Sequence, residues 1–76
     1  MAREDIITME IRGYAVRIQG LISDSMKGWW DGIRIESPDG VDSVITLSSP
    51  DQASLFGLLL GIRDLGIRLI SVTPIE

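Results

Sequence analysis

The sequence predicts an α+β fold, in which a four-stranded antiparallel sheet carries its helices on one face. Three observations predict it. The C-terminal third has the pattern of a strand, a helix and a strand, the N-terminal half has alternating apolar residues, and a turn motif joins two further strands. With 76 residues, the chain is expected to form one domain around a single thin core.

The C-terminal unit covers residues 44–73. Ser49 and Gln52 have the spacing of a capping box, Pro50 suits the first helical position, and Gly66 suits the left-handed residue that ends a helix. Strands are expected over 44–47 and 67–72, buried against the helix, because aliphatic and β-branched residues dominate them. Between the helix ends, apolar residues at helical spacing form one stripe: Leu55, Leu58, Leu59, Ile62 and Leu65.

Residues 7–18 alternate as a half-buried strand does. The apolar positions are odd up to Ile11 and even from Tyr14, so their phase changes at Gly13. A slip of one residue sends side chains to the opposite face of a sheet. Gly13 is therefore expected to form a bulge in one long bent strand or a break between two short ones, and we favour the bulge.

A short helix is expected next, over residues 25–30, followed by a hairpin whose strands cover 33–36 and 41–47. A Pro-Asp-Gly turn joins the hairpin strands. The resulting order is the ferredoxin-like βαββαβ sandwich, with both helices on one face of the sheet. Five residues are expected to point under the helices: Tyr14, Val16, Ile18, Ile33 and Ile35. Five others are expected on the outer face: Arg17, Gln19, Arg34, Glu36 and Thr46.

We expect residues 14–76 to form this α+β domain and residues 1–13 to be an N-terminal strand extension. A strand with no partner in its own chain often pairs with another chain. The extension is therefore expected to lengthen the sheet or reach a second subunit. Its apolar residues are interface candidates: Ile7, Met9 and Ile11.

The C-terminal helix also has an apolar flank outside its main stripe, formed by Ala53, Phe56 and Leu60. Two explanations are open. The short helix covers the flank with Met26, Trp29 or Trp30, or the flank is a subunit interface, because contiguous exposed apolar surface usually marks a contact. Another line of the same helix carries only small residues, where a neighbour can approach closely: Ser54, Gly57 and Gly61.

Trp29 and Trp30 are adjacent, and consecutive helical residues point about 100° apart. One ring is therefore expected in the core and the other at its rim. The outer ring either closes the edge of a thin core or anchors a partner or a flat ligand.

Catalysis is not expected. The chain has no histidine and no cysteine, and its carboxylates do not cluster at metal-ligand spacing. We expect no cofactor and no metal, and the aspartates are explained as caps, turn residues or solvated charges. Gly20, Ser23 and Asp24 lie in a segment that can present backbone amides to an anion, although it lacks the spacing of a phosphate loop.

Charge and hydropathy narrow the expected partners and location. A net charge of -4 and a pI near 4.6 oppose binding to nucleic acid. The longest apolar run, residues 58–60, is far too short to span a membrane, and the acidic first residues are unlike a signal peptide. A cysteine-free chain fits a reducing compartment. We therefore expect a cytoplasmic protein without nucleic-acid or membrane partners.

Residues 51–72 read DQASLFGLLLGIRDLGIRLISV, and Trp29, Trp30 and Gly32 precede them. This pattern resembles a group of short bacterial and archaeal proteins of uncharacterised function, and the similarity covers most of the chain from Tyr14 onward. Members of that group often carry histidine at the position of Phe56. Any role that rests on that histidine would be absent from this chain.

The segment 44–72 is also similar to the first strand, helix and strand of ACT domains, which are small regulatory modules that bind amino acids at dimer interfaces. The resemblance implies ligand sensing between subunits. The helix of ACT domains often begins Gly-Leu-Leu after an Asp-Arg-Pro turn, whereas here Gln52 and Ala53 follow Asp51. No ligand-binding residue is carried over from that family.

From these patterns we expect a non-enzymatic module that self-associates as a homodimer and serves as an interaction or assembly subunit. The alternative is an ACT-like regulatory domain that binds an amino acid or nucleotide at a subunit interface near residues 20–24. If the dimer uses the helix flank, Leu60→Asp should give a folded monomer.

Overall fold

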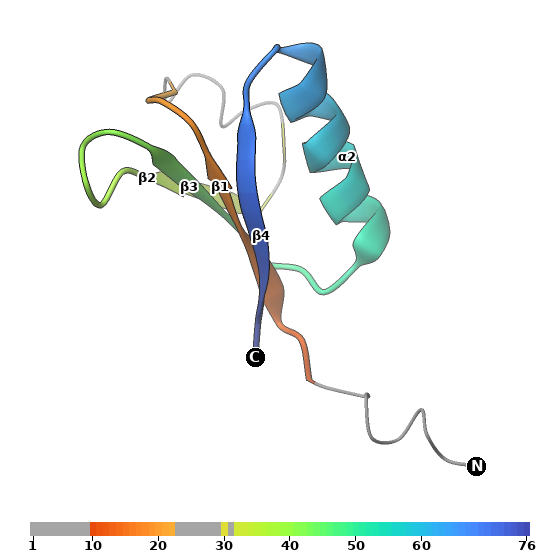
Figure 1. Ribbon diagram of the computed structural model, residues 1–76. Coiled ribbons are helices and arrows are strands. Elements are labelled where there is room, and N and C mark those ends of the chain that lie inside the picture. Colours follow the sequence, from red (N-terminus) through yellow and green to blue (C-terminus); the bar gives the residue numbers. More distant parts are fainter. Residues whose placement is uncertain (1–9, 23–29, 31) are drawn as a thin grey trace.

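The computed structural model describes residues 10–22, 30 and 32–76. This part of the chain forms a four-stranded antiparallel sheet in the order β2-β3-β1-β4, with one helix (Figure 1). The predicted α+β class and the antiparallel sheet are confirmed. The elements are β1 (Gly13–Ile18), β2 (Ile33–Glu36), β3 (Ser43–Leu47), α2 (Gln52–Asp64) and β4 (Leu69–Ile75).

The described residues do not match the six-element βαββαβ order, because they contain one helix, α2, between β3 and β4. Apart from Trp30, the short helix expected over 25–30 lies outside the described residues. So do Ile7 and Met9 of the expected N-terminal extension. The hairpin of β2 and β3 is confirmed, with Ile35 opposite Ile45 and a left-handed Gly40 in its turn.

Helix α2 begins two residues later than the predicted capping box. Asp51 is the N-cap, and its carboxylate accepts hydrogen bonds from the Ala53 amide and the Ser54 hydroxyl, each at 3.2 Å. The Ser49 hydroxyl instead accepts from the Asp51 amide at 3.2 Å. The prediction of Ser49 as the cap was wrong. A carboxylate is as good a cap as a hydroxyl, and its charge also favours the positive end of the helix dipole.

The end of α2 confirms the role predicted for Gly66. This residue has φ +73°, and its amide donates to the Arg63 carbonyl at 2.9 Å. The Ile67 amide reaches back to the Ile62 carbonyl at 3.1 Å, which completes a Schellman motif. No helix in the described ranges is long and apolar enough to cross a membrane.

Strand β1 starts at Gly13, so the predicted bulge there was wrong. Residues 10–12 are not in the strand, and the pairing of β1 with β4 shifts between Arg17 and Ile18 instead. Gly13 is buried, and it is needed for space rather than for a turn. A Cβ at this position would overlap the carbonyl oxygen of Leu47 on β3. The change in apolar phase therefore marks the start of the strand.

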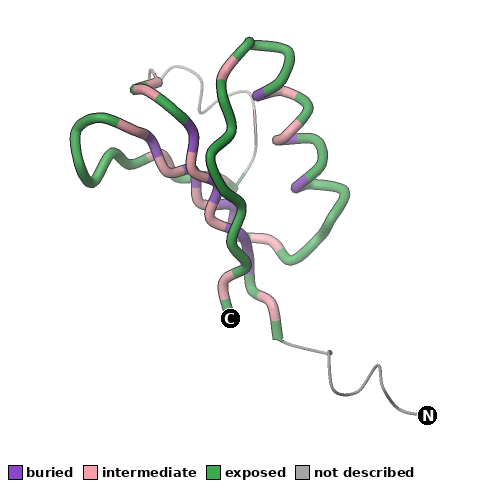
Figure 2. Tube along the Cα trace, viewed as in Figure 1, coloured by how far each residue is buried: buried purple, intermediate pink, exposed green. Residues whose placement is uncertain are grey.

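The core lies between α2 and the central strands, along the purple segments of Figure 2. Ile33 and Ile35 of β2 pack against it while half-buried, and so does Leu59. Leu65 was predicted to belong to the buried stripe, but it is exposed because it is the C-cap, where the helix ends. The buried apolar residues are Tyr14, Val16, Ile18, Ile45, Leu47, Leu55, Leu58 and Ile62.

Trp30 is half-buried and packs against this core, with its ring over the backbone of α2 at Gly61. A Cβ on Gly61 would lie 2.5 Å from Cζ2 of the Trp30 ring. The same atom on Gly57 would have no neighbour within 4 Å. One of the two helical glycines therefore makes room for a neighbouring ring, and the other does not.

Exchanging each of these glycines for alanine should change stability in opposite directions. Gly57→Ala is expected to raise the free energy of unfolding by about 0.5–1 kcal/mol, because alanine is the better helix former. Gly61→Ala gains the same propensity but must displace the Trp30 ring, so a net loss of about 1 kcal/mol is expected. Denaturant melts at one chain concentration measure both changes. Equal stabilisation by the two variants would show that Trp30 does not lie over Gly61.

Candidate functional site

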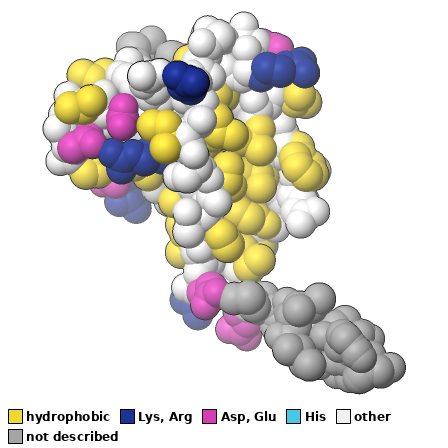
Figure 3. All heavy atoms as spheres, viewed as in Figure 1, with side chains coloured by type: hydrophobic (Ala, Val, Ile, Leu, Met, Phe, Trp, Pro, Cys, Tyr) yellow, Lys and Arg dark blue, Asp and Glu magenta, His cyan; other side chains and the backbone are white. Residues whose placement is uncertain are grey.

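The exposed large apolar residues are concentrated on one part of the molecule. Among the described residues, six of the eight such side chains belong to α2, its C-cap and β4. Figure 3 shows a continuous band of hydrophobic side chains between β4 and α2. Polar residues usually interrupt a solvent-facing surface, so this band is the candidate functional site. We call it the β4–α2 surface, formed by Phe56, Leu60, Leu65, Leu69, Ile70 and Val72.

Strand β4 supplies half of this surface. It occupies one edge of the sheet and pairs with β1 alone among the described strands. Its seven residues, LISVTPI, carry no charge, and Leu69, Ile70 and Val72 are between 37% and 47% exposed. Sequence analysis predicted this strand to be buried against the helix, and that prediction was wrong because the edge position leaves it uncovered.

Helix α2 supplies the other half through Phe56 and Leu60. These residues are four apart, so their side chains lie on one flank of the helix. Gly61, which faces the Trp30 ring, follows Phe56 by five residues and therefore lies about 140° around the helix axis from it. Trp30 thus covers a different side of α2, and both Phe56 and Leu60 stay at least half exposed.

The predicted interface residues differ in how far they are exposed. Phe56 and Leu60 are exposed on the β4–α2 surface, and Ala53 is exposed on α2. Ile11 is half-buried and packs against the core, as Trp30 does. Three further candidates lie outside the described residues: Ile7, Met9 and Trp29. Sequence analysis missed the β4 residues, although an uncharged run of seven residues is an available signal for an edge that can pair.

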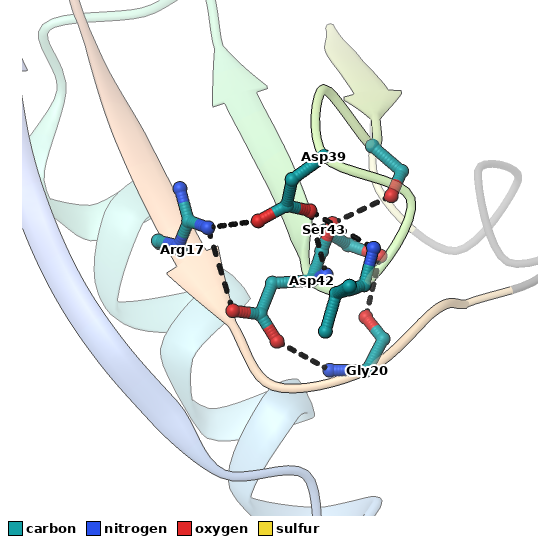
Figure 4. A network of polar contacts seen from close by, with 7 residues as sticks. Arg17, Gly20, Asp39, Asp42 and Ser43 are labelled. Carbon is teal, nitrogen blue, oxygen red and sulfur yellow. Dashed lines mark hydrogen bonds and ion pairs between the residues drawn. The ribbon is translucent and has the colours of Figure 1, made fainter.

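The predicted anion site near Gly20 has its backbone groups occupied by its own chain (Figure 4). The Gly20 amide donates to the Asp42 carboxylate at 3.2 Å, and its carbonyl accepts from the Ser43 hydroxyl at 2.7 Å. The Ile22 amide donates to the same hydroxyl at 3.3 Å. These bonds fasten the loop after β1 to the start of β3. Ser23 and Asp24, the other two candidates, lie outside the described residues.

The Arg17 guanidinium joins this network through Asp39 at 2.5 Å and Asp42 at 3.4 Å (Figure 4). The amides of Asp42 and Val41 donate to the Asp39 carboxylate and lower its pKa below the ordinary value, and Arg17 adds to this effect. Because the group is at the surface, the ion pair contributes little to stability. The network holds the turn between β2 and β3 beside β1, and each charge in it has a structural partner.

The described residues do not assemble a metal centre. Within 10–22, 30 and 32–76, no three acidic side chains lie close enough together to hold a metal ion. No pocket opens in the part of the chain that the structure describes. The feature that remains for function is the β4–α2 surface, which is open and apolar.

Fold and surface together define a small α+β sheet domain with an uncovered apolar edge. The chain belongs to the family described as a domain of unknown function, DUF8691, which matches residues 13–73. The family's range begins at the first residue of β1 and ends within β4. No curated protein and no solved structure matches the chain.

Proposed function

We propose that the chain is a non-enzymatic module that forms a homodimer and serves as an interaction or assembly subunit. We also propose that it is cytoplasmic, because a chain without cysteine suits a reducing compartment. The observation that carries the proposal is β4, an uncharged apolar strand on an open sheet edge. Such an edge presents unpaired backbone amides and carbonyls, except at Pro74, which has no amide hydrogen. Proteins that remain monomeric often protect an edge with charged side chains, and β4 has none.

The position of Phe56 and Leu60 beside this edge supports the proposal. Together with β4 they make one apolar surface, whereas the isolated exposed residues Leu21 and Val41 lie in loops. Apolar surface of this kind is stabilised when a second molecule covers it. A domain of 76 residues has a thin core, so self-association would also add to its stability.

We also propose that the complete domain is ferredoxin-like. Strands β1 and β2 are both antiparallel to β3, so they run in the same direction with β3 between them. A connection between two strands of the same direction has to cross over one face of the sheet, usually as a helix. Residues 19–32 are long enough for this crossover, and the helix expected over 25–30 would provide it.

The test is the absolute mass in solution, measured by light scattering on a sizing column over a wide range of dilution. The proposal expects twice the chain mass of 8.4 kDa at high concentration and a single transition toward 8.4 kDa on dilution. A mass of 8.4 kDa at every concentration would contradict the proposed homodimer. Larger open-ended species would show that the edge drives aggregation rather than closed assembly.

The ACT-like sensor is the weaker alternative. Its ligand was expected near residues 20–24, but the amide and carbonyl of Gly20 already have partners within the chain. An anion would have to displace the Asp42 carboxylate to reach that amide. We therefore propose self-association rather than ligand sensing.

A further inference from the structure

We propose that Asp39 and Gly40 form a site of isoaspartate formation, and that the polar network around Arg17 holds this site closed in the folded chain (Figure 4). An aspartate that precedes glycine is open to attack by the next backbone nitrogen, because glycine has no Cβ to obstruct the approach. The inference goes beyond the proposed self-association, since it concerns the turn between β2 and β3 and not the β4–α2 surface.

The reaction closes a succinimide ring within the backbone and needs no reactant besides water. The Gly40 nitrogen bonds to Cγ of the protonated Asp39 carboxyl, and the amide hydrogen leaves with the carboxyl hydroxyl group as water. Water then adds to a ring carbonyl. Opening at Cγ returns aspartate, whereas opening at the main-chain carbonyl breaks the original peptide bond and routes the backbone through the side chain. The result is an isomer of the same mass with a longer backbone.

The turn leaves enough space for this attack. Gly40 has φ +72°, and a Cβ on it would have no neighbour within 4 Å. The Asp39 side chain is 42% exposed, so water reaches it. Since neither packing nor burial blocks the reaction, the obstacle in the folded chain is the hydrogen bonding of the two reacting groups.

Both oxygens of the Asp39 carboxylate are engaged. Oδ1 accepts from the amides of Val41 and Asp42, each at 2.9 Å, and Oδ2 accepts from the Arg17 guanidinium at 2.5 Å. The two amides lower the pKa of Asp39, and Arg17 adds to this effect, so the protonated carboxyl that ring closure needs is scarce. The same bonds fix the direction of the carboxylate, which must turn toward the Gly40 nitrogen to react.

The attacking nitrogen is engaged as well. The Gly40 amide donates to the Ser37 carbonyl at 3.2 Å, which closes the turn. The Ser37 hydroxyl donates to the Asp42 carbonyl at 2.7 Å across the same loop. Ring closure removes the proton of the Gly40 amide and therefore breaks the hydrogen bond that closes the turn. The site is released when the turn opens, a local event that needs less free energy than global unfolding.

Arg17 connects this turn to a strand that lies further along the sheet. It belongs to β1, which is separated from β2 by β3, and it contacts Asp39 and also Asp42 at 3.4 Å. The two amide donors to the Asp39 carboxylate belong to the backbone, whereas the Arg17 donor is a side chain and can be removed by substitution. Arg17 is therefore a positioning residue through which the protection can be tested.

The first test compares the folded and the denatured chain. Both are incubated at the same mildly acidic pH, one folded by circular dichroism and one in guanidinium chloride, and isoaspartate is located by tryptic digestion and electron-transfer fragmentation. Isoaspartate at Asp39 is expected to form at least about tenfold faster in the denatured chain. Equal rates would overturn the protection, and no isoaspartate at Asp39 in the denatured chain would overturn the site.

The digestion also keeps a second Asp-Gly pair apart from this one. That pair is residues 31–32, and its aspartate lies outside the described residues. Trypsin cleaves after Arg34, so Asp39 is recovered in the separate peptide 35–63. Asp39→Ser is the blank for this peptide, because a serine hydroxyl can accept from the turn amides but cannot form the ring. An isoaspartate signal of parental size in that variant would overturn the assignment to Asp39.

Substitution of Arg17 tests the network itself. Arg17→Gln is expected to raise the rate in the folded chain about two- to fivefold, as the loss of an exposed ion pair allows, and to leave the rate in guanidinium chloride unchanged. Arg17→Lys keeps a positive charge and a donor, so its rate should lie closer to that of the parent chain. An unchanged rate in folded Arg17→Gln would overturn the role of Arg17.

Arg34→Gln is the matched control, because it removes the same charge from β2, where Arg34 is paired with Glu36 instead of Asp39. Its rate in the folded chain should equal that of the parent. Equal acceleration in Arg34→Gln and Arg17→Gln would show that net charge sets the rate, and would overturn protection by the ion pair. These rates do not depend on the mass in solution, so the result stands apart from the test of the homodimer.

Discussion

Leu60→Asp is expected to convert the homodimer into a folded monomer, with a dissociation constant at least about 100-fold higher than that of the parent chain. Leu60 is 50% exposed in the single chain, so a carboxylate there meets water and the fold is retained. In a dimer that covers the β4–α2 surface, the same carboxylate would be buried without a partner. Burying an unpaired charge is strongly unfavourable, and a homodimer carries the substitution twice.

Leu21→Asp is the matched control, because it makes the same chemical change at a residue that is 64% exposed in the loop after β1. This variant should remain a dimer of parent affinity. Light scattering gives the mass, and circular dichroism with a thermal melt verifies that both variants are folded. A Leu60→Asp chain that stays dimeric would exclude the α2 flank from the interface. Dissociation of both variants would point to net charge rather than to the β4–α2 surface.

The parts of the fold that the sequence predicted well depend on local chemistry. Gly66 ends α2 with φ +73°, and Gly40 takes φ +72° in the hairpin turn, because glycine adopts the left-handed conformation without strain. Alternation correctly placed Val16 and Ile18 inward, because the backbone of a strand fixes the period of its side chains. These signals need no knowledge of distant residues.

The errors concern choices that local chemistry leaves open. Ser49 and Asp51 are both good caps, and the helix uses Asp51, whose charge also favours the helix start. The bulge was assigned to Gly13 from a change of apolar phase, while the irregularity lies between Arg17 and Ile18, opposite β4. The choice of cap and the position of the irregularity both depend on how the strands and the helix pack. The neighbouring residues in the sequence do not specify that packing.

The sequence predicted the helical part of the candidate site and missed the part formed by β4. Phe56 and Leu60 stand outside the leucine stripe of α2, so helical periodicity alone identifies them. Leu69, Ile70 and Val72 were assigned to a buried strand because apolar composition usually means burial. Composition does not say whether a strand is central or at an edge. The order β2-β3-β1-β4 decides that, and it exposes β4.

Gly13→Ala should cause the largest loss of stability in the single chain, about 3 kcal/mol. Gly13 is not among the glycines with positive φ, so alanine can adopt its backbone conformation. The obstacle is space, because the new Cβ would overlap the Leu47 carbonyl oxygen and come within 3.4 Å of the Ser48 Cα. Both atoms belong to backbone, which cannot rotate away as a flexible side chain can. Strand β1 must therefore move off β3, and with β4 also paired to β1 the shift affects three of the four strands.

Gly57→Ala controls for the effect of replacing glycine on the unfolded chain, since it adds the same methyl group where no atom lies within 4 Å. Denaturant melts at one fixed concentration should therefore show a gain for Gly57→Ala and a loss for Gly13→Ala. The loss should appear in the free energy of unfolding with little change in the slope against denaturant, because the added methyl group strains the native sheet and leaves the exposed area of the unfolded chain almost unchanged. If Gly13→Ala matches the parent chain, β1 does not approach Leu47 this closely.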